Sequence, residues 1–398
     1  MERLIIRENY RLFMKSLSGA DVEGKDVLLR TDLNLPLEDG EPQRSLRFER
    51  YLETIEDLSG RGAKVFVLAH QGRPGREDFI SLEGHAELVS DYLGRDVGFV
   101  ESFFGSELEE TIDGMVGGDV VLLENIRFLS EELQNSSPED HADDIFVDYL
   151  SGFFDLYVGD GFSVAHRSHG SIVGFPQVMD SCIGPVMSEE LENCSKVREE
   201  FSDGVLVLGG EKPSDLVPVI EEMIEDVGKV LLGGVPGELA LIAEGHDLGD
   251  KEDWIRENGF DSEEEKLLEL VESYKDKFVL PVDVSTREGV FKVDEDFEAM
   301  TWDIGEQTVE RFVDEVRDAD QVLMKGPLGK FEEHSEGTEK VVDAIADNDG
   351  FTVLGGGHTS SLVNRFGHGF DDFSHVSIAG GAFVRFLSGE ELPGIEVL

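Results

Sequence analysis

Residues 157–171 read YVGDGFSVAHRSHGS and place one arginine, Arg167, and two histidines, His166 and His169, in a single short stretch. The apolar run before this stretch predicts a buried strand, and its GDG sequence predicts a turn. The cations therefore lie on a loop at the carboxyl end of a strand, which is where ligands bind in open α/β sheets. A multiply charged anionic ligand is one interpretation. A surface turn with a solvated arginine is equally consistent with this stretch alone.

Three other strand-like runs end in polar loops of the same kind. The residues that follow them are Asp32 and Asn34, then His70 and Arg73, then Arg127. Strands and helices alternate over residues 26–175, which predicts a parallel sheet with right-handed crossovers and all four loops at one edge. Asp32 and Asn34 could equally form an Asx turn before Pro36. Each arginine alone would suit a surface ion pair, but together they favour an oxyanion pocket with bidentate phosphate and carboxylate contacts.

Arg47 opens a predicted helix whose apolar residues recur at helical spacing from Phe48 to Leu58. A cation at a helix amino terminus is unfavourable to the helix dipole, so its position indicates a nearby anion. The stretch EELQNSSPEDHADD at 131–144 is instead interpreted as a solvated acidic loop without a functional role.

The second half of the chain repeats the strand–loop–helix plan, with glycines at the strand ends. Strands are predicted at 205–208, 229–232, 278–284, 321–324 and 351–354, and the stretch 250–266 is expected to be a connection or a helix. The glycines are Gly209 and Gly210 before Lys212, then Gly233 and Gly234, then Gly326 in KGPLGKFE, then Gly355 to Gly357. Several such loops in register predict a cradle for nucleotide phosphates, because glycine lets backbone amides approach an anion. One glycine pair alone would suit a tight turn, and neither GxxxxGK[ST] nor GxGxxG is present.

Length and composition limit the class of protein. The chain has 398 residues, more than one core usually fills, so two domains are expected. It carries 87 acidic and 34 basic residues, and the net charge of −53 argues against nucleic-acid binding. The sequence shows no signal peptide and no apolar run of membrane-spanning length, so we expect a cytoplasmic protein without a membrane partner. Cys182 and Cys194 are too few for a disulfide framework and are expected to be buried.

Nine sequence words taken together resemble phosphoglycerate kinase along essentially the whole chain, in particular a salt-adapted archaeal-type member. They are RTDLN, AHQGRP, LLENIRF, DGFSVAHRSH, LGGEKPSD, DIGEQT, KGPLGKFE, GGGHTS and FSHVSIAGGA, in the family's order and spacing. The resemblance implies an α/β protein with two Rossmann-like three-layer domains, mainly parallel sheets and a hinge. Residues 1–186 would bind 3-phosphoglycerate, residues 187–375 would bind ATP or ADP, and residues 376–398 would return to the first domain.

The resemblance also implies a role for each matching residue. On the acid side, Asp32 and Asn34 would bind the hydroxyl and carboxylate region, and Arg73, Arg127 and Arg167 the phosphate, with His70 alongside and His166 and His169 lining the loop. Arg47 and Lys212 would be catalytic. On the nucleotide side, Glu332 would contact the ribose, and Gly355, Gly356 and Gly357 the phosphates, with Gly210, Gly233, Gly234, Lys325 and His358 also belonging to this site.

Three positions depart from the family's common pattern. Leu216 stands where a second lysine is frequent, Lys325 where an asparagine is frequent, and His358 where an aspartate is linked to the magnesium ion. We hypothesise that Lys325 supplies the charge missing at Leu216. Histidine is a poor partner for Mg²⁺, so the resemblance leaves the metal ligands undefined.

The implied reaction is reversible phosphoryl transfer between 1,3-bisphosphoglycerate and ADP, which gives 3-phosphoglycerate and ATP, with Mg²⁺ as cofactor and the enzyme as a monomer. Two alternatives stay open. Leu216 and His358 would suit a catalytically weakened relative that binds nucleotide or sugar phosphate. A kinase for another small carboxylate is the second, although Asp32, Asn34 and the three arginines disfavour it. A scaffold role is disfavoured because glycines at so many strand ends would only weaken it.

The net charge predicts that salt stabilises this protein. Self-repulsion destabilises the compact state in dilute buffer, and it is screened when the Debye length falls to about 3 Å in 1 M salt. Thermal unfolding followed by circular dichroism should give a higher Tm in molar than in dilute KCl. Equal Tm values would contradict adaptation to a salt-rich cytoplasm.

Overall fold

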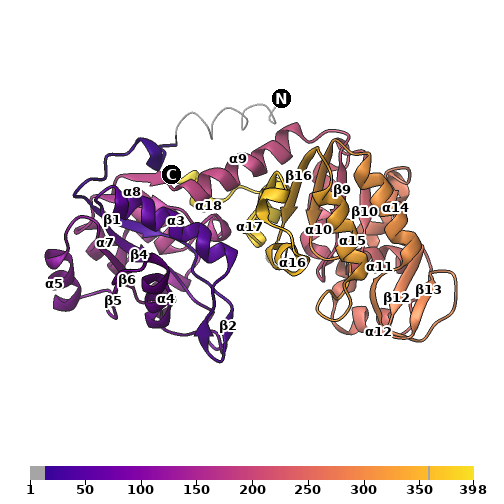
Figure 1. Ribbon diagram of the computed structural model, residues 1–398, viewed down its shortest axis with the longest axis horizontal. Coiled ribbons are helices and arrows are strands. Elements are labelled where there is room, and N and C mark those ends of the chain that lie inside the picture. The colour runs from indigo at the N-terminus through magenta and orange to yellow at the C-terminus, as the bar shows by residue number, and fades with distance from the viewer. Residues whose placement is uncertain (1–13, 357–358) are drawn as a thin grey trace. The chain divides into compact units, whose positions relative to one another are not determined.

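The structure is a computed structural model that describes residues 14–356 and 359–398 (Figure 1). Residues 1–13, Gly357 and His358 lie outside the described residues. The expectation that the chain lacks a signal peptide concerns mainly residues 1–13, so the structure does not test it. The chain divides into two compact units: Met1–Glu192 with Glu391–Leu398, and Asn193–Glu390.

The first unit is built on a six-stranded sheet in which all the strands are parallel. Its order is β5 (Gly98–Val100), β6 (Val120–Leu123), β4 (Lys64–Leu68), β1 (Asp26–Arg30), β7 (Leu156–Gly159) and β8 (Ser181–Ile183). From β1 the chain moves to one side of the sheet, and from β7 it moves to the other. The topological switch point therefore lies between β1 and β7, and their carboxyl ends border the crevice where α/β sheets bind ligands.

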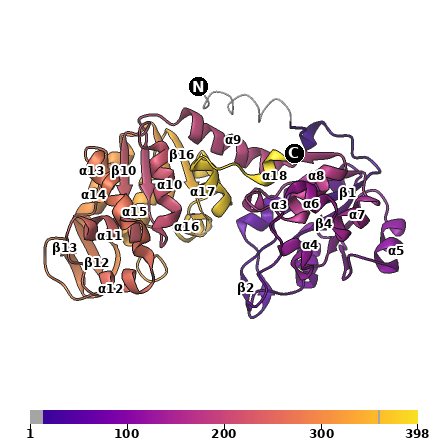
Figure 2. The ribbon, with the colours of Figure 1, turned by 180° about the vertical axis from the view of Figure 1, so that it is seen from behind.

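Helices cover both faces of this sheet (Figures 1 and 2). They are α3 (Leu46–Gly60), α4 (Glu83–Leu93), α5 (Ser106–Gly114), α6 (Pro138–Ala142), α7 (Ile145–Ser151), α8 (Phe175–Val178) and the C-terminal α18 (Pro393–Glu396). Short 3₁₀ helices lie at Leu17–Gly19, Ile126–Phe128, Glu131–Leu133 and Phe162–Val164, a π-helix at Gly170–Gly174, and a small hairpin at β2 (Leu37–Glu38) and β3 (Glu41–Pro42). Alternate strand residues such as Leu28 and Phe66 pack with α5 and α7 in one core cluster, as the two-residue period of a strand requires.

The acidic stretch 131–144 is not the solvated loop that its composition suggests. It forms the 3₁₀ helix Glu131–Leu133 and helix α6, and it buries the side chains of Glu132 and His141. Glu132 and His141 bond residues of the segment 168–171. The prediction was wrong because a count of charges does not show which carboxylate faces a buried cation.

The second unit has its own six-stranded parallel sheet. Its order is β11 (Phe278–Val279), β10 (Lys229–Leu232), β9 (Val205–Leu208), β15 (Gln321–Lys325), β16 (Phe351–Gly355) and β17 (His375–Val376). Here the switch point lies between β9 and β15. The helices are α10 (Pro213–Met223), α11 (Gly234–Ala243), α12 (Asp250–Glu257), α13 (Glu264–Ser273), α14 (Glu306–Arg317), α15 (Glu336–Ala346), α16 (Thr359–Arg365) and α17 (Gly381–Leu387), with 3₁₀ helices at Phe260–Glu263 and Phe370–Asp372.

A small antiparallel sheet in the second unit was not predicted. Its order is β13 (Gly289–Lys292), β12 (Asp283–Thr286) and β14 (Thr301–Ile304). The single strand expected at 278–284 is therefore two strands, β11 and the start of β12, which belong to different sheets. Pro281 lies between them, and proline cannot donate a hydrogen bond to a sheet, which accounts for the break.

One helix, α9 (Pro185–Glu200), crosses the boundary between the units. The unit limit falls at Glu192, inside this helix, whereas 186 was expected. At the other end, β17 pairs with β16 of the second sheet, and only Glu391–Leu398 belong with the first unit, a shorter return than the expected 376–398. Both cysteines are buried, as predicted. Among the described residues, every helix falls short of the length and apolarity needed to cross a membrane.

Candidate functional site

The candidate anion site of the first unit is a cavity of about 600 Å³ at the carboxyl ends of the parallel strands. Its lining residues are Asn34, His70, Gly72, Arg73, Arg76, Glu77, Asp78, Arg127 and Arg167. The loops after β1, β4, β6 and β7 thus meet at one edge, as their pattern in the sequence predicts. Gly72 is required here, because its φ is +65° and an added Cβ would lie 2.2 Å from the carbonyl oxygen of Asp78.

Arg127 contributes a buried guanidinium to the lining of this cavity. The residue is 4% exposed, its guanidinium donates to the carbonyl oxygen of Gly72, and its buried Nε has no hydrogen-bond partner among the described residues. Burial, followed by the charges of Arg167 and Arg30, lowers the pKa of Arg127 to about 10. Cations held this close in a buried place favour an anionic ligand, which would offset their repulsion.

Asp32 lies behind the cavity and does not line it. Its carboxylate, 3% exposed, accepts hydrogen bonds from Arg47 at 3.4 Å, from the hydroxyl of Ser163 and from the backbone N–H of Asn34. Burial would raise the pKa of Asp32, but the charge of Arg47 and the hydrogen bonds from Ser163 and the N–H of Asn34 outweigh it and hold the pKa well below its ordinary range. Asp32 is therefore ionised at neutral pH and fixes the position of Arg47.

Arg47 stands in the first turn of α3, as predicted. The helix is capped by Ser45, whose hydroxyl accepts from the N–H of Phe48 at 3.2 Å. The Arg47 guanidinium is about one-fifth exposed, and Asp32 is the buried anion near it. The position of Arg47 at a helix start suggested a nearby anion, and Asp32 of the same chain is at least part of that anion.

His70 is a neutral group of the cavity wall. Burial lowers its pKa well below the ordinary histidine value, and Arg30, Arg127 and Arg167 act in the same direction against Asp32. Its Nδ1 lies 3.4 Å from a guanidinium nitrogen of Arg30, which can only donate, so Nδ1 accepts and Nε2 carries the proton. The Nε2–H group is then left as a donor for a ligand oxygen.

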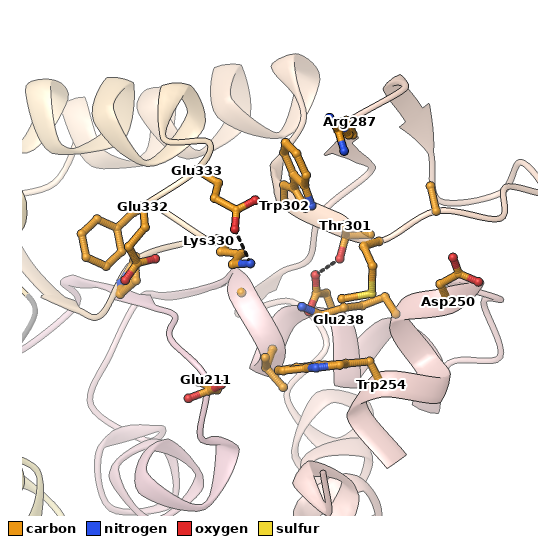
Figure 3. A pocket seen from close by; sticks show the side chains of 18 of the residues that line it. Glu211, Glu238, Asp250, Trp254, Arg287, Thr301, Trp302, Lys330, Glu332 and Glu333 are labelled. Carbon is orange, nitrogen blue, oxygen red and sulfur yellow. Dashed lines mark hydrogen bonds and ion pairs between the residues drawn. The ribbon is translucent and has the colours of Figure 1, made fainter. Parts of the chain in front are cut away.

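The second unit contains a larger cavity, of about 730 Å³ (Figure 3). Among its lining residues are Gly210, Gly234, Trp254, Trp302 and Glu332. Figure 3 shows the two indole rings on its walls, and the hydroxyl of Thr301 donates to the carboxylate of Glu238 beside them. The apolar and aromatic part of this wall suits a nucleotide base, and charged side chains, most of them acidic, line the rest of the cavity.

The glycines of the second unit let three loops pack closely. An added Cβ on Gly209 would lie 2.2 Å from the carbonyl oxygen of Pro327, and one on Gly233 would lie 2.8 Å from the side chain of Leu328. Gly210 differs, because it has a φ of +104° and open space where its Cβ would be. Its backbone therefore borders the cavity without obstruction.

Two lysines flank the switch point of the second sheet. Lys325 ends β15, opposite Leu208 of β9 and Gly355 of β16. Its ammonium group, 15% exposed, lies 3.9 Å from Asp215. Burial lowers its pKa, and Lys212 acts in the same direction, whereas Asp215 opposes them. Leu216 is a buried apolar residue and supplies no charge here. Lys212 and Lys325 lie close enough that the charge of Lys212 lowers the pKa of Lys325.

The described residues contain no cluster of three or more metal-ligating side chains. Mg²⁺ is commonly held by one or two carboxylates together with substrate phosphates. Asp215, in the first turn of α10 and half exposed, is a carboxylate that suits such a site.

Two buried residues behind the first cavity escaped prediction from the sequence. Arg30, which is 2% exposed, ends β1 directly after its apolar run, and a charge at that position was the signal available. Glu132 gave no such signal, because it stands among other acidic residues. Of the two histidines of the opening motif, His169 contacts Glu132 at 3.5 Å, and neither histidine lines the cavity.

Comparison with known proteins gives one consistent result. A family model described as phosphoglycerate kinase matches residues 17–390. The phosphoglycerate kinase of Halorubrum lacusprofundi is 44% identical over 388 residues, which cover 94% of this chain and 95% of the relative, and that of Haloarcula marismortui is 42% identical, covering 94% and 97%. The crystal structure of phosphoglycerate kinase from Pyrococcus horikoshii OT3 superposes with a TM-score of 0.91 at 33% identity, covering 97% and 98%.

The unused donor of Arg127 predicts unequal contributions from the arginines of the first cavity. Arg127→Gln should weaken binding of inorganic phosphate by about tenfold or more, because a hydrogen bond to a charged group contributes about 1.5–3 kcal/mol. Arg76→Gln removes the same charge from an exposed lining residue and should weaken binding by less than about threefold. Isothermal titration calorimetry at fixed KCl measures both, and equal losses would contradict a special role for Arg127.

Proposed function

The chain belongs to the phosphoglycerate kinase family, and on that premise we propose how its residues divide the work. Its reaction is the reversible transfer of a phosphoryl group between 1,3-bisphosphoglycerate and ADP, which gives 3-phosphoglycerate and ATP. Within the chain, the observation that carries the proposal is the arginine-lined cavity with the buried, unused Nε of Arg127.

The three-carbon acid binds in the cavity of the first unit. Arg73, Arg127 and Arg167 hold its phosphate, which guanidinium groups contact in a bidentate manner. Asn34 and the Nε2–H of His70 meet the hydroxyl and carboxylate region. Asp32 supports this end of the site from behind by holding Arg47.

The nucleotide binds to the second unit. The base enters the cavity between Trp254 and Trp302, and Glu332, on the same lining, binds the ribose. The phosphates meet the backbone amides of the glycine loops after β9, β10 and β16, together with Lys212. This arrangement is supported by the position of those loops at the carboxyl ends of parallel strands.

Mg²⁺ would be held by the nucleotide phosphates and by Asp215. When bound, it would neutralise part of the negative charge on the phosphate oxygens. Whether His358 contributes lies outside the described residues.

The chemistry asks the chain for alignment and positive charge. A β-phosphate oxygen of ADP attacks the phosphorus of the acyl phosphate, the new P–O bond forms, and the carboxylate leaves. A carboxylate is a stable leaving group, so no general base is needed. Arg47 and Lys212 stabilise the charge on the equatorial oxygens, and Lys325 adds the second ammonium group. Because the acid and the nucleotide bind to different units, we propose that a hinge movement accompanies each turnover.

The net charge of −53 supports a salt-rich cytoplasm as the place where this enzyme works. We also propose that the enzyme works as a monomer.

Arg47→Ala should lower kcat by about 10²–10³-fold, because the variant loses a group that stabilises charge in the transition state. The KM for nucleotide should change by less than about threefold, since Arg47 belongs to the acid side of the site. Arg50→Ala is the matched control, because Arg50 lies one turn later on α3 and pairs with Glu53 and Glu189. Steady-state kinetics in molar KCl give both parameters. A variant with wild-type kcat would remove Arg47 from the chemistry.

Lys325 should set the alkaline limit of activity. Its pKa lies below the ordinary lysine value, so the ammonium charge is lost as the pH rises through that lowered pKa, and kcat should fall with it. Lys325→Arg keeps its charge at high pH and should shift the fall in kcat to higher pH, even if its maximal kcat is lower. Lys266→Arg, at an exposed lysine paired with Glu221, is the control. An identical pH profile for Lys325→Arg and the wild type would exclude Lys325 from the reaction.

A further inference from the structure

A buried carboxylate stands behind the arginine-lined cavity without being part of its lining. The side chain of Glu132 is fully buried. Its Oε2 accepts from the backbone N–H of Ser171 at 2.8 Å, and its Oε1 accepts from the hydroxyl of the same serine at 2.7 Å. Both oxygens are therefore committed to one residue of the segment that follows Arg167.

The hydroxyl of Ser171 connects Glu132 to Arg30. It accepts from Nε of Arg30 at 2.9 Å while it donates to Glu132. In the described part of the chain, no carboxylate lies within ion-pair distance of Arg30, so Glu132, on the other side of one hydroxyl, is the charge that compensates it. Arg30 in turn lies 3.4 Å from His70 of the cavity wall. A polar chain thus runs from Glu132 to the cavity.

Glu132 also fixes the backbone that carries Arg167. Its Oε1 lies 3.5 Å from Nδ1 of His169, and Ser171 lies within the π-helix Gly170–Gly174, a rare element that often marks functional positions. A second contact from the same acidic stretch joins Nε2 of His141 to the carbonyl oxygen of Ser168 at 3.0 Å. Both contacts hold the segment that begins directly after Arg167.

Two opposing effects of this carboxylate can be separated. Burial would raise the pKa of Glu132, but His169, Arg30 and the N–H of Ser171 outweigh it and lower the pKa, so the group is charged at neutral pH. A negative charge behind the cavity weakens its positive potential and by itself disfavours an anionic ligand. A positioning role acts in the opposite direction, because it keeps Arg30, His70 and Arg167 where the ligand needs them.

We propose that Glu132 is a positioning residue for the anionic substrate, acting through Ser171 on Arg30 and on the segment that carries Arg167. The inference rests on the proposed function of the cavity as the site for 3-phosphoglycerate. It assigns a role to the acidic stretch 131–144, and it predicts that removal of a negative charge weakens the binding of an anion.

Glu132→Gln tests the proposal, because it keeps the shape of the side chain and removes the charge. We expect the Kd for 3-phosphoglycerate, measured by isothermal titration calorimetry in molar KCl, to rise about tenfold or more, the size of effect known for residues that orient metal ligands. The KM for nucleotide should stay within about twofold of the wild-type value, since the second unit is untouched. Glu131→Gln is the matched control, because it makes the same change one residue away at a partly exposed side chain and should leave the Kd unchanged. An unchanged or lower Kd in a folded Glu132→Gln variant would overturn the proposal.

Ser171→Ala gives a second, independent test. It removes the bridging hydroxyl and keeps the backbone N–H bond to Glu132, so we expect a smaller rise in the Kd for 3-phosphoglycerate. The double variant should show less than the sum of the two single effects, because both act through one contact chain. Additive effects would overturn the proposal. Should circular dichroism show that Glu132→Gln does not fold, Ser171→Ala alone decides, and an unchanged Kd in it would be the overturning result.

Failure of the proposed function would look different. If the wild-type chain neither binds nor phosphorylates 3-phosphoglycerate, the function itself is wrong, and the inference about Glu132 falls with it. If the wild-type chain is active and the Glu132 and Ser171 variants bind the acid normally, only the positioning role is wrong.

Discussion

The arrangement of charges in the first unit is governed by repulsion among buried cations at the edge of its sheet. Arg30 and Arg127 are almost completely buried, and Arg167 lies close enough to lower the pKa of Arg127. Such a cluster is costly unless each charge has a partner or a ligand. Asp32 and Glu132 supply negative charge to this cluster from within the chain. Arg127 and Arg167 also line the cavity, where an anionic ligand would add further compensation.

In the second unit, glycines let three loops approach one another closely. Its loops after β9, β10 and β15 approach one another so closely that an added Cβ at Gly209, Gly233 or Gly326 would meet backbone or side-chain atoms of the next loop. Small residues are therefore required here by the packing of the loops, whatever ligand the loops bind. The two lysines at the same edge add charge where the backbone can offer only dipoles.

The acidity of the chain and the basicity of its site follow from different physics. Exposed carboxylates repel one another through solvent, and salt screens that repulsion over a few ångströms. The cations behind the first cavity lie away from solvent and are screened far less. A net charge of −53 is therefore compatible with an anion site in the first unit, because the local field of a buried cluster survives in salt where the field of the surface does not.

The sequence by itself determined the alternation of strands and helices, and hence two parallel sheets with the loops bearing Asn34, Arg73, Arg127 and Arg167 at one edge, because strand direction and right-handed crossovers leave few other arrangements. It also placed Arg47 at a helix start. Only the tertiary structure decided which charges are buried. Glu132 and its exposed neighbours are chemically alike along the chain, Asp32 faces Arg47 instead of lining the cavity, and the residues after 278 divide between two sheets. Burial and pairing depend on contacts between residues far apart in sequence, and local patterns of charge and hydrophobicity do not contain that information.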